Sequence, residues 1–267
     1  MLMTGICAAE DFFEPVHPRW TLQRLAAHQQ LHLIVAPHPD DDVIGAGGMM
    51  ALLARLRRPV AVVYVTTGAP AGRRSAGMAS ARRAEALDAL RVVQARAAFF
   101  LPFTSKDVRD EPARVSSVLL RIMNRVQPMA LYLPCPFEQH ATHQAVTRMT
   151  VEALRRCRTG ACELWGYSVW SALPSSPFVR SVDITRVAQL KRAAIEQHKS
   201  QVFFKDYAGG ILGLNRHAAV FSTMQPDRKE IRYAEQFLDM RMLVLNRRLS
   251  LERFAAQVFV GASGSAE

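Results

Sequence analysis

The sequence contains no apolar stretch of the roughly 18 to 20 residues that a membrane-spanning helix needs. Only four of its 267 residues are cysteines, and no two of them form a C-x-x-C motif. A chain of this length can build its core without disulfides, so we expect reduced cysteines, as in cytosolic proteins. The first fifteen residues lack the basic segment and the apolar run of a secretory leader. These absences predict a soluble, cytoplasmic protein.

Acidic residues are outnumbered, with 23 Asp and Glu against 34 Lys and Arg, which gives a formal net charge of +11. Such an excess suits an anionic small molecule, a nucleic acid or an anionic membrane surface. The arginines are scattered, however, and no basic tract alternates with aromatic residues. We therefore expect no nucleic-acid partner and favour a small-molecule partner, anionic or lipid-linked.

Apolar, β-branched runs alternate with helical patterns through most of the chain, which is typical of βαβ units and a parallel sheet. Strands are expected at 31–37, 60–67, 97–103, 129–134 and 163–170. Helices are expected between them at about 45–57, 79–95, 111–127 and 141–157. Right-handed crossovers then give an α/β fold with a doubly wound, mostly parallel Rossmann-like sheet and helices on both faces.

The pattern changes after Trp170. The later segments are a Pro- and Ser-rich stretch at 171–185, a helix at about 186–201, a weakly periodic stretch at 202–231, a helix at about 233–245 and a disordered tail at 261–267. The chain shows no internal repeat. We therefore expect a single domain over residues 1–267, with its core at about 31–245.

A histidine and three aspartates directly follow the first predicted strand, in the stretch IVAPHPDDDVIGAGG at 34–48. Open parallel sheets bind ligands beyond the carboxyl ends of their strands, where His38 and residues 40–42 fall. This loop can be a solvated turn, a magnesium site with oxygen ligands, or a zinc-like site that combines imidazole and carboxylate. The histidine favours the zinc-like site, which needs further ligands from elsewhere.

The glycines of the same stretch do not complete a dinucleotide-binding fingerprint. The motif G-x-G-x-x-G fails at Met50, and no acidic residue closes the next strand near Thr67. Small residues here are explained more simply, because they let the backbone approach a ligand and let the helix pack on the sheet.

Two histidines follow the fourth predicted strand, in LPCPFEQHATHQA. At the start of a helix the rings of His140 and His143 project to one side. Either can be an ordinary surface histidine, but the topology brings both to the sheet edge that carries His38. Two histidines and one carboxylate around an open position make a catalytic zinc site, in which the pKa of a bound water falls to about 7. Adjacent aspartates do not easily reach one metal, so one is left to act as a base.

These motifs resemble those of the LmbE-like family of metal-dependent de-N-acetylases, which includes the N-acetylglucosaminylphosphatidylinositol de-N-acetylases (PIG-L). The resemblance spans roughly residues 32–237. Its motifs are PHPDDD after the first strand, TTGAPAG after the second, RRAEALDAL in the second helix, HATH after the fourth strand, and KRAAIEQHKSQ with YAEQF near the end.

The resemblance implies that His38, Asp41 and His143 bind Zn²⁺, or Fe²⁺ in the cell. It implies further that Asp40 is the general base and that His140 steadies the oxyanion or protonates the leaving amine. The implied enzyme is a metal-dependent amidohydrolase. Its reaction is hydrolysis of the N-acetyl group of an N-acetylglucosamine-type sugar conjugate, which gives a free amine and acetate.

Three further residues have both a functional and a structural interpretation. Arg82 matches an arginine near the substrate in the family, although with Glu85 one turn later it can form an ordinary surface ion pair. His198 can be a structural histidine with its hydrogen bonds satisfied, and Cys135 a small buried residue. Of these, only Arg82 is taken as a substrate-binding candidate.

Three positions depart from the residues that are usual in the family. Glutamate is common where Asp42 stands, and aspartate is common where Glu138 and Thr142 stand. The missing carboxylate at Thr142 could remove a partner that orients a histidine. We expect these departures to affect fine tuning and substrate choice more than the metal site.

Three other functional classes remain open. A carbohydrate- or membrane-binding relative without catalysis would show broken ligands, whereas all five site positions are intact here. A basic nucleic-acid-binding protein would bind with a steep salt dependence and need no metal. A phosphoesterase usually brings two metals, and therefore more carboxylate ligands than this chain supplies at its strand ends.

Overall fold

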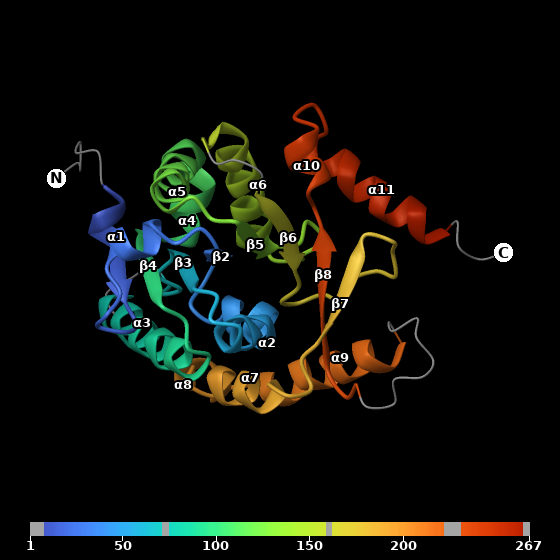
Figure 1. Ribbon diagram of the computed structural model, residues 1–267, viewed down its shortest axis with the longest axis horizontal. Helices are drawn as coiled ribbons and strands as arrows, with labels where there is room; N and C mark the ends of the chain where they lie inside the picture. Colours follow the sequence, from blue (N-terminus) through green and yellow to red (C-terminus); the bar gives the residue numbers. More distant parts are fainter. Residues whose placement is uncertain (1–7, 71–74, 159–161, 222–230, 264–267) are drawn as a thin grey trace.

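The computed structural model describes residues 8–70, 75–158, 162–221 and 231–263, and its centre is an eight-stranded sheet in the order β1-β4-β3-β2-β5-β6-β8-β7 (Figure 1). The strands are β1 (Phe13–Pro15), β2 (His32–Ala36), β3 (Val60–Thr66), β4 (Ala97–Phe103), β5 (Ala130–Pro134), β6 (Glu163–Tyr167), β7 (Val179–Asp183) and β8 (Ala234–Asp239). The strands from β4 to β6 run parallel, while β1, β7 and β8 pair antiparallel with their neighbours. The predicted α/β fold with a mostly parallel sheet is confirmed.

The central strands are continuous apolar runs because the sheet is covered on both faces. Every residue of β2 and β3 is buried. The chain extends the sheet from β2 through β3 to β4, and then returns to add β5 and β6 on the other side of β2. The strand order therefore reverses between β2 and β5, where open α/β sheets form their ligand crevice.

Helices pack in two layers on the sheet (Figure 1). One layer contains α1 (Leu22–Ala26), α4 (Ser105–Asp110), α5 (Pro112–Val126), α6 (Ala141–Arg156), α10 (Met242–Leu245) and α11 (Leu251–Ser263). The other contains α2 (Asp41–Arg55), α3 (Ser75–Val92), α7 (Ala188–Ile195), α8 (Lys199–Val202) and α9 (Tyr207–Phe221). A short 3-10 turn (Ala9–Phe12) precedes β1.

The late part of the chain differs from the prediction. The expected helix at 233–245 is wrong over its first half, because residues 234–239 form β8 between β6 and β7. Both faces of β8 are largely buried, so its sequence AEQFLD has no alternation that would mark a strand. The weakly periodic stretch contains the helix α9, and the expected strand at 163–170 ends at Tyr167. The helix expected at 186–201 is divided into α7 and α8.

Several smaller expectations can be compared with the described residues. Cys135, Cys157 and Cys162 are free thiols, while Cys7 lies outside the described residues. Helix α11 continues to Ser263, inside the expected disordered tail, whose residues 264–267 also lie outside the described part. None of the described helices is long and apolar enough to cross a lipid bilayer.

A buried histidine at the start of β2 makes stability depend on pH. His32 is 5% exposed, and its Nδ1 lies 3.2 Å from the hydroxyl of Tyr132. Burial, aided by the charge of Arg58, lowers the pKa of His32 to about 4, whereas the unfolded chain takes up this proton near its ordinary value of 6.5. The stability contribution is therefore fully present above pH 6.5 and is lost as the pH falls towards 4, by about 2 kcal/mol at pH 5.

Urea unfolding of wild type and His32→Asn at pH 7 and pH 5 measures this contribution. Asparagine cannot take up the proton, so the variant should lose about 2 kcal/mol less of its unfolding free energy between the two pH values than wild type does. The exposed His17 provides the matched control, because His17→Asn should keep the wild-type dependence. An unchanged pH dependence in His32→Asn would show that acid destabilisation arises elsewhere.

Candidate metal centre

The candidate site lies at the carboxyl ends of β2 and β5, the neighbouring strands between which the strand order reverses. His38 follows β2, and Asp41 is the first residue of α2. His140 caps the N-terminus of α6, and His143 lies in the first turn of that helix. The sheet thus brings together two histidines, His38 and His143, that are 105 residues apart in the sequence.

The loop between β2 and α2 turns sharply at Asp40, whose φ of +143° is rare for any residue but glycine. After this turn the carboxylates of Asp40 and Asp41 have different partners. Asp41 Oδ2 accepts a hydrogen bond from the backbone N–H of His38 at 2.8 Å. Asp40 Oδ2 accepts one from Nη2 of Arg82 at 3.0 Å. The two adjacent carboxylates are therefore available for different tasks.

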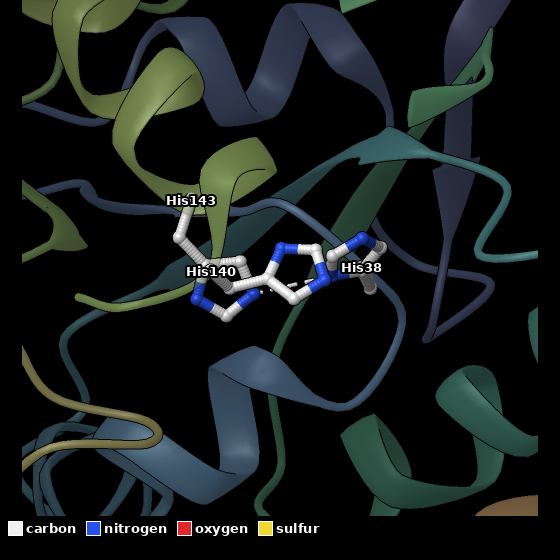
Figure 2. Close-up of side chains that lie close together, drawn as sticks. All are labelled: His38, His140 and His143. Atoms are coloured by element: carbon white, nitrogen blue, oxygen red, sulfur yellow. Dashed lines mark hydrogen bonds between the residues drawn. The ribbon is translucent and has the colours of Figure 1, made fainter. Parts of the chain in front are cut away.

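Three potential ligand atoms form a nearly equilateral triangle. Asp41 Oδ2 lies 3.0 Å from His38 Nδ1 and 3.2 Å from His143 Nε2. The two ring nitrogens lie 3.2 Å from each other, and Figure 2 shows the rings converging with His140 beside them. Ligand atoms at about 2.0 to 2.1 Å from a tetrahedral zinc ion are roughly 3.3 Å apart, so this triangle fits one face of such a coordination shell.

His140 belongs to the same cluster. One ring nitrogen each of His38, His140 and His143 lies within 4.8 Å of the others, so the three histidines can hold a metal ion. His140 Nδ1 accepts a hydrogen bond from the backbone N–H of Thr142 at 3.3 Å. Burial, followed by the nearby His143 and His38, lowers the pKa of His140. In the neutral ring the proton is therefore on Nε2, which makes this nitrogen a hydrogen-bond donor.

His143 is fully buried between two carboxylates. Its Nδ1 lies 3.0 Å from Glu138 Oε2, and its Nε2 faces Asp41. Although burial lowers it, Asp41 and Glu138 raise the pKa of His143 to about 10. Against the effect of burial, His143 and His38 hold the pKa of Asp41 well below its usual range. The cluster therefore stabilises positive charge at this point, and a metal cation would supply such charge.

Arg82, the candidate substrate contact, is 7% exposed and holds the loop that carries Asp40. Its Nη1 donates to the carbonyl of Gly68 at 2.6 Å. Its Nη2 donates to the carbonyl of Pro39 and to Asp40 Oδ2, both at 3.0 Å. A side chain at Gly68 would displace the guanidinium, since its Cβ would lie 2.6 Å from Nη1. Arg82 thus positions Asp40, and its contact with a substrate stays a prediction.

The sequence also singled out Glu85, His198 and Cys135, and the structure shows the surroundings of each. Glu85 accepts hydrogen bonds from the backbone N–H and the hydroxyl of Ser200, at 2.8 and 2.7 Å, and so fixes the start of α8. His198 is 1% exposed, and neither of its ring nitrogens has a hydrogen-bond partner among the described residues, so the interpretation as a histidine with satisfied hydrogen bonds is wrong. Burial, aided by Arg82, lowers the pKa of His198 to about 3. Cys135 is fully buried, and this burial raises the pKa of its thiol to about 12.

Asp42 and Thr142, two of the positions that depart from the usual family residues, are buried. Asp42 Oδ2 accepts a hydrogen bond from the hydroxyl of Tyr64 at 2.8 Å, and burial raises the pKa of Asp42 to about 7. Thr142 brings no carboxylate to the cluster, but its backbone N–H orients His140. A main-chain donor therefore orients this histidine.

A cavity of about 330 Å³ opens beside the cluster. Besides the cluster itself, it is lined by residues that the sequence did not indicate, among them Ser105, Trp170, Gln201 and Tyr207. The rings of Trp170 and Tyr207 meet edge to face with centroids 5.9 Å apart. Trp170 follows β6 at the same sheet edge, which is a signal available from the sequence. Tyr207 lies at the start of α9, where no local pattern indicated a helix.

Comparison with solved structures confirms the fold. N,N'-diacetylchitobiose deacetylase from Pyrococcus horikoshii is 21% identical over 85% of this chain and 90% of its own, with a TM-score of 0.66. The 4-carboxy-2-hydroxymuconate hydratase from Pseudomonas putida KT2440 is 21% identical over 79% and 96%, with a TM-score of 0.65. A zinc-inhibited form of teicoplanin deacetylase is 16% identical over 78% and 97%, with a TM-score of 0.62.

Sequence comparison addresses the family. No curated protein matches the chain at a significant level. A family model described as GlcNAc-PI de-N-acetylase, PIG-L, matches residues 33–154. This segment contains both halves of the cluster, from the loop after β2 to the first turn of α6. Over residues 33–154, a little under half of the chain, the sequence is thus similar to the PIG-L family.

Proposed function

We propose that the protein is a zinc-dependent N-deacetylase that hydrolyses the N-acetyl group of an N-acetylglucosamine-type sugar conjugate to acetate and a free amine. The observation that carries this proposal is the triangle formed by His38, Asp41 and His143, beside a cavity that Asp40 also lines. A metal position and a separate carboxylate at one cavity are the groups that metal-assisted amide hydrolysis requires. The family match over residues 33–154 supports the same reaction.

His38, Asp41 and His143 would hold the metal. Two nitrogens and one carboxylate oxygen suit zinc and also ferrous iron. When bound, such an ion polarises the acetamide carbonyl and lowers the pKa of water at the site. His140 lies close enough to reach the same ion. Because its Nδ1 accepts the hydrogen bond from Thr142, which favours the proton on Nε2, we assign His140 to proton donation and not to metal binding.

Asp40 is proposed as the general base. Its side chain is 14% exposed, and Arg82 occupies Oδ2, which leaves Oδ1 to take a proton from water. Burial, and then the neighbouring Asp41, raise the pKa of Asp40 well above its usual range, while Arg82 opposes this shift. A raised pKa suits a group that must accept a proton near neutral pH. His140 Nε2–H would donate to the carbonyl oxygen or to the leaving amine.

An aromatic wall in the cavity supports a sugar substrate. The indole of Trp170 is 51% exposed and rests against Tyr207, so it offers a flat apolar surface beside the polar cluster. Lys205 Nζ lies 5.8 Å from the centre of the Trp170 ring, which suits an anionic group on the aglycone. Two of the structural relatives are deacetylases by name, whereas a third is a hydratase. Support for a sugar substrate therefore comes from Trp170, Tyr207 and Lys205 and not from the fold.

We further propose that residues 1–267 form one domain, that it acts in the cytoplasm, and that its partner is a small molecule and not a nucleic acid. A single sheet that joins β1 near the N-terminus to β8 late in the chain supports the single domain. The core then begins before residue 31, since β1 starts at Phe13.

The test combines metal analysis with an amine-release assay. Protein purified without added metal should contain about one zinc or iron per chain and should release amine from N-acetylglucosamine conjugates with phosphate, nucleotide or lipid aglycones. Chelation should abolish turnover, and added zinc should restore it. Metal-dependent sugar binding without amine release would support the alternative, a relative that has lost catalysis. Protein without metal, even after reconstitution, would refute the mechanism.

A further inference from the structure

One buried carboxylate, that of Glu138, contacts both the metal cluster and the backbone of the segment that carries Trp170. Its Oε2 lies 3.0 Å from Nδ1 of His143. Its Oε1 accepts hydrogen bonds from the backbone N–H groups of Val169 and Trp170, at 2.7 and 3.2 Å. The side chain is 0% exposed, so these protein groups satisfy a carboxylate that water does not reach.

Towards the cluster, Glu138 determines which nitrogen of His143 carries the proton. An ionised carboxylate can only accept hydrogen bonds, so in the neutral ring that metal binding requires it favours the proton on Nδ1. The lone pair of Nε2 then faces His38 and Asp41, at the corner of the triangle that would hold the metal. A carboxylate in this place also fixes the orientation of the ring.

Away from the cluster, Glu138 anchors the chain that follows β6. Val169 is 5% exposed, whereas Trp170 is 51% exposed and lines the cavity. The backbone at this point is therefore held from within, while the indole projects to where a sugar would lie. Without an acceptor, both N–H groups would lose their partner, and the backbone that carries the indole would lose this anchor.

We infer that Glu138 is a positioning residue that couples the two halves of the site, because it prepares His143 for metal and holds Trp170 in place for the substrate. The inference deepens the proposed function and rests on it for the nature of the metal and the sugar. Its consequence is that metal affinity and the position of Trp170 depend on the same carboxylate. Oε2 faces His143, while Oε1 holds Val169 and is the nearer of the two oxygen atoms to the N–H of Trp170, which also lies 3.3 Å from Oε2.

Glutamine and alanine at this position separate the two roles. The glutamine side chain has one carbonyl oxygen, which can stay with Val169 and Trp170 while its NH₂ group faces His143. Because NH₂ only donates, Nδ1 of His143 must then accept, and the proton moves to Nε2, where the metal would bind. Alanine supplies no acceptor to either side.

The experiment measures zinc affinity by chelator competition and the emission of Trp170 in a Trp20→Phe, Trp165→Phe background, in which Trp170 is the remaining tryptophan. In Glu138→Gln we expect zinc affinity about 10- to 100-fold below that of the parent, with unchanged Trp170 emission. In Glu138→Ala we expect the same loss together with shifted Trp170 emission and a higher KM. Glu163→Gln, which changes an exposed glutamate of β6, is the matched control and should alter neither readout.

The outcomes separate this inference from the proposed function. Equal zinc affinity in Glu138→Gln and the parent would overturn the inference alone, as would unchanged Trp170 emission in a folded Glu138→Ala. A parent protein that binds zinc but deacetylates no sugar would overturn the proposed function, while the two readouts on Glu138 would still decide the coupling. A parent protein that binds no zinc would overturn both.

Discussion

Replacing Asp40 by asparagine is expected to lower kcat by about 10²- to 10⁴-fold while the metal content stays unchanged. Asparagine keeps the size of the side chain, and its amide oxygen can still accept the hydrogen bond from Arg82. Asparagine is also among the residues that best tolerate a positive φ, so the turn at φ +143° should survive. What the variant lacks is a group that can take a proton, and the loss in kcat therefore measures proton transfer.

The pH profile distinguishes this loss from a structural defect. The base must be ionised, so wild-type activity should fall as the pH drops through the raised pKa of Asp40, above the ordinary aspartate value of about 3.9. The residual activity of Asp40→Asn should lack this acid limb. Asp88→Asn, which changes an exposed aspartate of α3, is the control with wild-type kinetics. Wild-type turnover in Asp40→Asn would assign the base to another group.

The half of the site on the loop after β2 could be predicted because its signal is local. A buried apolar run that ends in His38 and a series of aspartates indicates both the strand and the polar residues at its carboxyl end. Linking this loop to His143 needed only the general rule for parallel sheets, and the pairing of β2 with β5 fulfils it. The different partners of Asp40 and Asp41 follow from a sharp turn that no residue type indicated.

The rest of the site depends on contacts between distant segments. Glu138 finds its partners in Val169 and Trp170, about thirty positions later, and no periodicity relates them. Arg82 was predicted to contact a substrate because it matches an arginine near the substrate in the family, yet three oxygen atoms of the chain accept hydrogen bonds from it. The strand β8 was predicted as a helix because its neighbours in the sheet, and not its own sequence, determine its conformation.

The relatives show why these contacts matter for function. A deacetylase and a hydratase share this fold with TM-scores of 0.66 and 0.65 to the chain, so the sheet alone does not determine the reaction. We expect the residues at the carboxyl ends of β2, β5 and β6 to determine it, and one of them, Asp41, is the first residue of helix α2. The stability of α2 is therefore linked to the integrity of the site.

A buried ion pair between α7 and β8 holds the middle of helix α2. Lys191 Nζ of α7 lies 2.7 Å from Glu235 Oε1 of β8, and both side chains are 1% exposed. The same carboxylate accepts hydrogen bonds from the backbone N–H groups of Gly48 and Met49, both at 2.7 Å. A Cβ at position 48 would lie 2.6 Å from Ile184 and 2.9 Å from the carboxylate, so glycine permits this close approach. The buried charge of Glu235 is thus compensated by Lys191 and by two backbone N–H groups in the middle of α2.

Lys191→Met is therefore expected to lower the free energy of unfolding by about 3 to 5 kcal/mol, because it leaves the carboxylate of Glu235 buried without its cation. Urea unfolding measures the loss, and Lys106→Met, at an exposed lysine that pairs with Asp110, should change stability by less than about 1 kcal/mol. The double variant Lys191→Met, Glu235→Gln should be more stable than the sum of the single losses predicts, since removing both charges removes the unpaired one. If the losses of unfolding free energy in the two single variants simply add up in the double variant, the two side chains stabilise α2 independently and do not act as an ion pair.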